Sequence, residues 1–125
     1  MNAWTEISLD SFRGAGLLYR GERWRSCISR YYYAAFSAVS EALRRAGYVR
    51  SGYETPPHRE ITALIRRHFT SLYPKHRRAL MAAIRRMYDA RLVADYRSVR
   101  TSDRDVAQNA RRDAIEVYRL LGVSL

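Results

Sequence analysis

The apolar side chains of this chain follow the period of an α-helix almost throughout. Five segments place them at intervals of three and four positions, which puts them on one face of a helix. These segments cover residues 3–20, 22–46, 58–72, 75–98 and 103–121. No convincing stretch alternates apolar and polar residues in the manner of a half-buried strand. The pattern therefore predicts an all-α protein, an antiparallel bundle of about five helices joined mostly by short turns.

Glycine, proline and capping residues mark the ends of these segments. Gly21, Gly47 and Gly122 each follow an apolar stripe and are expected to end a helix. Residues 101–103, Thr-Ser-Asp, are a capping cluster in front of the last segment. Residues 48–57 include a glycine and a Pro-Pro pair, which predict an exposed, mobile loop.

The stripes also define the expected core. The first segment is expected to bury Trp4, Ile7, Ser11, Ala15 and Leu18. The second is expected to bury Trp24, Ile28, Tyr31 or Tyr32, Ala35, Val39 and Leu43, with Cys27 and Phe36 beside them. Glu41 falls with the arginines on the opposite, polar side of that helix.

Three consecutive tyrosines, Tyr31 to Tyr33, lie within the run Ser-Arg-Tyr-Tyr-Tyr-Ala-Ala-Phe at 29–36. Successive residues of a helix point about 100° apart, so the three rings cannot all face one core. At least one hydroxyl must reach solvent, a polar pocket or a partner. Aromatic rings next to arginine can stack on nucleic-acid bases. Tyrosine is more often found in cores and dimer interfaces, and we favour that interpretation.

The fourth segment contains a charged residue where its apolar line requires a core residue. Leu80, Ile84, Met87 and Ala94 follow the helical period, and Arg91 lies between the last two. Asp95 comes one turn after Arg91, so the two can form an ion pair along the helix. A charge facing inward is costly unless it is paired or reaches a wet pocket or an interface. The pair is therefore either a polar site, shared between two copies of the chain, or a structural ion pair that orients the helices.

The net charge changes the picture further. The 125 residues contain 23 basic and 12 acidic side chains, a formal charge of +11, and Lys75 is the only lysine. Arginine binds phosphate through a planar fork and stacks on bases, so the excess favours an acidic partner such as nucleic acid. A merely solvated basic surface would give the same composition. We take Arg30, Arg44, Arg45 and Arg97 as candidate RNA-binding residues.

Several classes of site and location are not expected. One cysteine, Cys27, allows neither an internal disulfide nor a cysteine metal cluster. The spacing of His58, His68 and His76 matches no metal motif, and no glycine-rich phosphate loop occurs, so we expect neither metal nor cofactor. The longest uncharged stretch, 31–40, is too short to span a membrane, and the N-terminus lacks the apolar core of a signal peptide. A single cytoplasmic domain over residues 1–125 is expected.

Three motifs resemble those of one known family. The run at 29–36 resembles the pattern S-R-x-Y-Y-A-x-F, and His-Arg-Glu at 58–60 resembles the T-H-x-x entry of its third helix. Residues 91–96, Arg-Leu-Val-Ala-Asp-Tyr, resemble the signature R-x-x-A-D-Y. In this order they resemble the HEPN domain family, in its small stand-alone prokaryotic branch, over nearly the whole chain.

The resemblance implies a helical bundle that usually forms a homodimer. Many members are metal-independent ribonucleases of toxin–antitoxin and antiviral systems, encoded beside a minimal nucleotidyltransferase that neutralises them. Active members carry an arginine followed, after four to six residues, by a histidine, and two copies form one composite site. Here Arg91 matches the arginine, but Tyr96, Arg97 and Ser98 occupy the positions where the histidine is expected.

Three hypotheses follow. The first is a dimeric RNA- or partner-binding module of a toxin–antitoxin or defence system, with little or no catalysis. The second is an active ribonuclease toxin whose composite site contains Arg91, Asp95, Tyr96 and His58, paired with a nucleotidyltransferase antitoxin. The third is a scaffold that binds only a protein partner.

Overall fold

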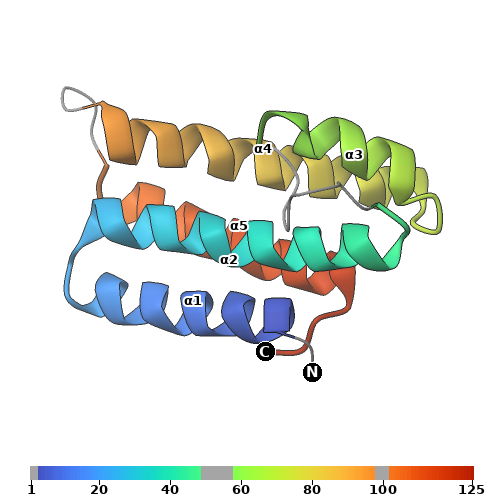
Figure 1. Ribbon diagram of the computed structural model, residues 1–125. Helices are drawn as coiled ribbons and strands as arrows, with labels where there is room; N and C mark the ends of the chain where they lie inside the picture. Colours follow the sequence, from blue (N-terminus) through green and yellow to red (C-terminus); the bar gives the residue numbers. More distant parts are fainter. Residues whose placement is uncertain (1–2, 49–57, 98–101) are drawn as a thin grey trace.

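A computed structural model describes residues 3–48, 58–97 and 102–125, all within one helical bundle (Figure 1). The elements are α1 (Ala3–Arg20), α2 (Trp24–Arg45), the 3₁₀ turn η1 (His58–Glu60), α3 (Ile61–His68), α4 (Pro74–Tyr96) and α5 (Arg104–Leu121). No residue in these described ranges belongs to a β-strand. The predicted all-α bundle of five helices is confirmed. The predicted loop at 48–57 lies, apart from Tyr48, outside the described residues.

Helix α2 is the centre of the bundle. It packs against α1, α4 and α5, and its C-terminal half also touches α3 (Figure 1). Helices α1 and α4 run antiparallel to α2, whereas α5 runs in the same direction as α2 (Figure 1). An ion pair of 3.1 Å between Arg104 Nη2 and Glu22 Oε1 joins the starts of α5 and α2. Because α2 has neighbours on several sides, every residue from 34 to 41 is buried.

The buried face of α1 differs from the predicted stripe. Ile7 was expected in the core but is 46% exposed, whereas Ser8 and Leu9 are buried. The Ser8 hydroxyl donates to the Ala34 carbonyl over 2.5 Å and lies 2.7 Å from the Tyr118 hydroxyl. These bonds to α2 and α5 turn the serine side of α1 inward, which a hydrophobic pattern does not predict because serine counts as polar.

Glu41 was expected on the polar side of α2, and this is wrong, since only 1% of the residue is exposed. Its carboxylate is compensated by two arginines of the same helix. Arg44 Nη2 lies 2.7 Å from Oε1, and Arg45 Nε lies 3.6 Å from the same oxygen. The guanidinium groups remain more than half exposed, so the pair buries only its acidic member.

Two helices begin or end away from the predicted positions. Helix α2 begins at Trp24 instead of residue 22, because the turn before it places Glu22 at φ 58°, outside helical geometry. The predicted helix 58–72 is a 3₁₀ turn followed by a helix that ends at His68. Tyr73 precedes Pro74 and is extended, at φ −57° and ψ 145°, as the proline ring requires of the residue before it. The last residues of the predicted segment therefore form the connection to α4.

The predicted helix caps are confirmed where the structure describes them. Asp103 caps α5, and its Oδ1 accepts from the Val106 amide over 3.1 Å. Gly122 ends α5 at φ 74°, and Gly47 follows α2 at φ 101°, both in the left-handed region that glycine tolerates.

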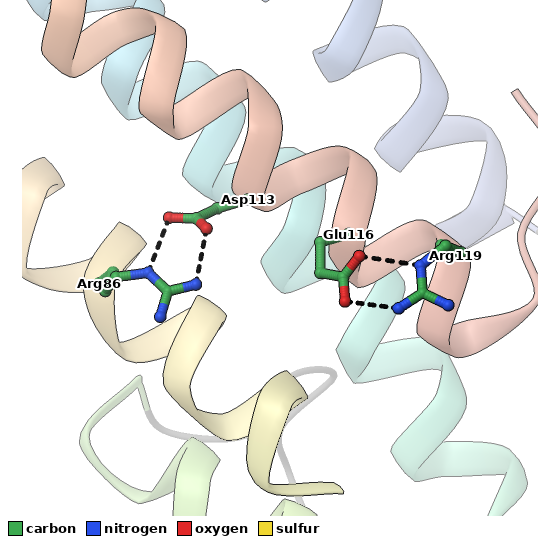
Figure 2. A network of polar contacts seen from close by, with 4 residues as sticks. All are labelled: Arg86, Asp113, Glu116 and Arg119. Carbon is green, nitrogen blue, oxygen red and sulfur yellow. Dashed lines mark hydrogen bonds and ion pairs between the residues drawn. The ribbon is translucent and has the colours of Figure 1, made fainter. Parts of the chain in front are cut away.

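An ion pair between helices joins α4 to α5. Arg86 contacts both carboxylate oxygens of Asp113, over 2.8 and 3.3 Å (Figure 2). Figure 2 also shows Glu116, one turn further along α5, bound in the same two-point way by Arg119. The Arg86–Asp113 contact fixes the register of α4 against α5 because both of its hydrogen bonds need one geometry.

Cys27 lies at the seam between α1 and α2 and has no exposed surface. Its Sγ is 3.4 Å from the Ala15 carbonyl oxygen, and burial raises the pKa of the thiol to about 11. None of the described helices is both long enough and apolar enough to cross a membrane.

Replacing Tyr118 by Phe tests the contact between α1, α2 and α5. The ring and its edge contact with Phe12 remain, but the hydroxyl that bonds Ser8 is lost. We expect the free energy of unfolding to fall by about 1–2 kcal/mol, measured by urea denaturation. Tyr73→Phe is the control, because Tyr73 is 72% exposed and should change stability little. Equal stability of both variants and the parent chain would show that the buried hydroxyl contributes nothing.

Candidate functional site

Arg91 lies among tyrosines at the contact between α4 and α2. Its side chain is 13% exposed, so the predicted inward orientation is confirmed. The Nη2 group donates to the Tyr33 hydroxyl over 3.0 Å. The guanidinium carbon also lies 5.3 to 5.9 Å from the ring centres of Tyr33, Tyr96 and Tyr32, within the range of cation–π attraction.

Asp95 is held from two helices. Its Oδ2 lies 3.0 Å from Arg91 Nε, one turn earlier on α4, and accepts from Ser29 Oγ of α2 over 3.2 Å. The Nε–H bond is not aligned with that oxygen, so the contact is an ion pair and not a directed hydrogen bond. The predicted pairing of Arg91 with Asp95 is confirmed. We call Ser29, Tyr33, Arg91 and Asp95 the Arg91 cluster.

The three tyrosines of α2 have separate surroundings, as their angular spacing predicted. Tyr31 and Tyr32 are buried, whereas Tyr33 is 38% exposed. Ser29 and Tyr33 are four residues apart and therefore face α4 together. Neither was predicted as a site residue. Their presence in the S-R-x-Y-Y motif was the signal that could have identified them.

His58 reaches the edge of the same cluster from η1. Its Nδ1 is 2.7 Å from the Tyr32 hydroxyl, and its ring stacks on Phe36 at 4.1 Å between centres. Burial, and then the positive charge of Arg91, lower the pKa of His58 below its ordinary value. Burial raises the pKa of the Tyr32 hydroxyl. At neutral pH the pair is therefore a neutral imidazole and a protonated phenol.

A polar groove opens beside the Arg91 cluster, between α1, α2 and the end of α4. It has a volume of about 370 Å³ and is lined by Leu18, Ser26, Ser29, Arg30, Tyr33 and Asp95. We call it the α2–α4 groove. Arg30 is exposed and is the basic side chain at this groove, so a phosphate group could bind to its guanidinium with hydroxyl donors nearby.

Arg25 fixes the end of α4, which carries Asp95 and Tyr96. Its Nη1 donates to the Ala94 carbonyl over 2.7 Å and its Nη2 donates to the Arg97 carbonyl over 2.9 Å. These two bonds satisfy carbonyl groups that a helix end leaves without partners. The role of Arg25 was not predicted, because no sequence signal relates it to a helix about 70 residues away.

The structure separates the remaining predicted residues. Tyr96 is 69% exposed at the edge of the Arg91 cluster, and Arg97 is exposed directly after it. Arg44 and Arg45 are at the other end of α2, about 20 Å from Arg30 along the helix axis at 1.5 Å per residue. The structure does not bring these two arginines to the Arg91 cluster.

No group of three or more His, Cys, Asp or Glu side chains in the described part of the chain is arranged to hold a metal ion. The Arg91 cluster offers charge stabilisation by a fixed guanidinium, and His58 beside it offers proton exchange at an imidazole.

The chain was compared with known protein families. A family model described as the HEPN domain matches residues 1–123. Comparison with curated proteins gives no match.

The influence of Arg91 on His58 can be measured by NMR titration of the imidazole protons. We expect the pKa of His58 to lie below 6.5, and to rise in Arg91→Gln because one of its two causes is removed. Arg97→Gln, a change of equal charge at an exposed position, should leave it unmoved. An unchanged pKa in Arg91→Gln would contradict the electrostatic coupling.

Proposed function

Because this chain belongs to the HEPN domain family, a nuclease or RNA-binding type of module at family level, we propose that it is a dimeric RNA-binding module with little or no catalysis of its own. The observation that carries the proposal is the α2–α4 groove, where Arg30 and Tyr33 lie beside an arginine that is already fixed in place. Phosphate contacts from arginine supply affinity without reading sequence, as suits a chain with a charge of +11.

The exposed aromatic rings at the site support the same function. Tyr33 and Tyr96 both present ring surface to solvent within reach of the Arg91 guanidinium. Unpaired bases stack on such rings, and a neighbouring guanidinium adds cation–π attraction. An RNA strand would then bind by its phosphates at Arg30 and by a base at Tyr33, and Tyr96 is left for the contact with a second copy of the chain.

We further propose that the protein is a homodimer through the face of Arg91, Asp95 and Tyr96. Tyrosine is enriched in protein interfaces. Tyr96 is 69% exposed in the single chain, and a second copy could cover it. A second copy on this face would cover the partly exposed Asp95, whose side chain is 27% accessible, and strengthen its ion pair.

A second candidate is a metal-independent ribonuclease, which the position of His58 favours. In that reaction the 2′-hydroxyl attacks the adjacent phosphorus, the bond to the 5′ oxygen breaks, and the leaving oxygen takes a proton from water, so that a cyclic phosphate and a 5′-hydroxyl form. His58, neutral at pH 7, would accept the 2′ proton at Nε2 in the tautomer whose Nδ1–H donates to the Tyr32 hydroxyl oxygen. Arg91 would stabilise the charge on the phosphate. As a ribonuclease toxin, the protein would be paired with a minimal nucleotidyltransferase as its antitoxin. The third alternative is that the protein is a scaffold that only binds such a partner protein.

RNA binding is tested by fluorescence anisotropy with a labelled single-stranded RNA at several salt concentrations. We expect Arg30→Gln to weaken binding about three- to tenfold and to lower the slope of log K against log salt by about 0.7, the loss of one phosphate contact. Arg112→Gln, an exposed arginine of α5, is the matched control. Binding that is absent, or insensitive to salt, would favour the protein scaffold.

Incubation of the same RNA with purified protein and a chelator separates binding from cleavage. Intact RNA is expected from the leading proposal. Cleavage that is lost in both Arg91→Gln and His58→Asn would instead establish the ribonuclease. Cleavage that survives in both variants would point to a contaminating nuclease.

The dimer is tested by light scattering on a size-exclusion column. The parent chain is expected to run as a dimer, and Tyr96→Asp as a monomer of unchanged helix content, because a charge on the proposed interface repels its copy. Tyr73→Asp alters an equally exposed tyrosine at the start of α4 and should remain dimeric. A monomeric parent chain, or two dimeric variants, would contradict this interface.

A further inference from the structure

The positive charge of the chain is concentrated in η1, α3 and the first half of α4. Residues 58–86 make up less than a quarter of the sequence and contain eight basic side chains against the single acid Glu60, a net of +7 out of +11. The basic residues are Arg59, Arg66, Arg67, Lys75, Arg77, Arg78, Arg85 and Arg86. The α2–α4 groove contains none of them.

Helix α3 lies along the first half of α4 (Figure 1), so basic side chains of the two helices lie close in space. We call the exposed basic side chains of η1, α3 and this half of α4 the basic surface. A depression of about 280 Å³ lies between them, lined by His58, Arg59, Ile61, Thr62, Arg85, Tyr88 and Asp89. We call it the α3–α4 depression. Its basic side chains are Arg59 of η1 and Arg85 of α4, and the rings of His58 and Tyr88 also line it.

The helical repeat extends the basic rows beyond the depression. Arg66 lies one turn after Thr62 on α3, and Arg78 lies two turns before Arg85 on α4. Both are exposed, and neither has an ion-pair partner among the described residues. Arg85 and Asp89 are 3.9 Å apart and more than 60% exposed, so water and salt screen their pair. Like charges gathered in this way repel one another, and an added anion would relieve the repulsion.

The side of the depression that is lined by His58 and Tyr88 adjoins the Arg91 cluster. The Tyr88 ring is 5.7 Å from the Tyr32 ring, and Arg91 follows Tyr88 by one turn of α4. The rings of His58 and Tyr88 lie within 20° of parallel, with 6.2 Å between their centres. A strand on the basic surface could therefore continue to the proposed RNA site without leaving the protein.

We propose that the α3–α4 depression and its flanking arginines bind a second stretch of the same single-stranded RNA. The phosphates lie along Arg59, Arg66, Arg78 and Arg85, and a base reaches the rings of Tyr88 and His58. The bases must be unpaired to present their faces to these rings. Asp89 would repel a phosphate, but its carboxylate can accept a hydrogen bond from a base amino group. This inference rests on the proposed function, which it extends to Arg66, Arg78 and Arg85, three residues outside the sequence motifs.

The test compares two triple variants of equal charge in anisotropy titrations with a labelled single-stranded oligouridine. One variant is Arg59→Gln, Arg66→Gln and Arg85→Gln, and the control is Arg13→Gln, Arg20→Gln and Arg112→Gln on exposed positions of α1 and α5. The first should bind at least about tenfold more weakly near 0.1 M salt, with the salt slope reduced by about 2, and the control should lose less than about threefold. Equal losses in the two variants, or none in either, would overturn the proposal.

Further outcomes separate this inference from the proposed function. If the parent chain does not bind the oligouridine, both the proposed function and this inference are wrong. If Arg30→Gln weakens binding and the triple variant of the α3–α4 depression does not, only this inference is wrong. Tighter binding to polyglutamate than to RNA would assign the surface to an acidic protein, and equal binding to duplex RNA would remove the requirement for unpaired bases.

Photo-crosslinking gives an independent measurement. An RNA of the same length containing 4-thiouridine should form adducts on the peptides that carry His58 or Tyr88. Adducts confined to α1 or α5 would overturn the proposal whatever the affinities.

Discussion

A guanidinium that is largely removed from water needs a counter-charge and polar or aromatic neighbours, and the contact between α2 and α4 supplies these to Arg91. The Tyr33 hydroxyl, the Asp95 carboxylate and three aromatic rings surround the charge, and Ser29 holds the carboxylate in turn. An unpaired charge in this position would cost several kcal/mol. The same contacts of Arg91 therefore determine both how α4 aligns with α2 and how the residues of the site are arranged.

The sequence predicted those parts of the fold that depend on local chemistry. Helix number, the cap at Asp103 and the end at Gly122 each follow from the helical period or from a cap that a few neighbouring residues specify. The wrong predictions concern residues whose burial depends on partners that are distant in the sequence. Ser8 is buried because its hydrogen bonds come from α2 and α5, and Glu41 is buried because α2 is enclosed on several sides. A hydropathy pattern contains no information about such partners.

The residues of the candidate site likewise include some that the sequence could predict and some that it could not. Arg91 and Asp95 were predictable, since they are one turn apart and interrupt an apolar line. The contact of His58 with Tyr32 was not, because it joins residues 26 apart in sequence through the packing of η1 on α2. The basic rows of α3 and α4 also escaped the sequence analysis. Their arginines are dispersed along residues 59–86 of the sequence, and they come close in space only through the antiparallel packing of α3 on α4.

The buried thiol of Cys27 has a consequence for handling and observing the protein. Only a thiolate reacts readily with alkylating reagents, and a pKa of about 11 leaves almost none at neutral pH. The sulfur is also shielded by the contact of α1 with α2 near Ala15. Alkylation of Cys27 therefore requires these two helices to separate, so the rate of alkylation reports how often the contact between α1 and α2 opens.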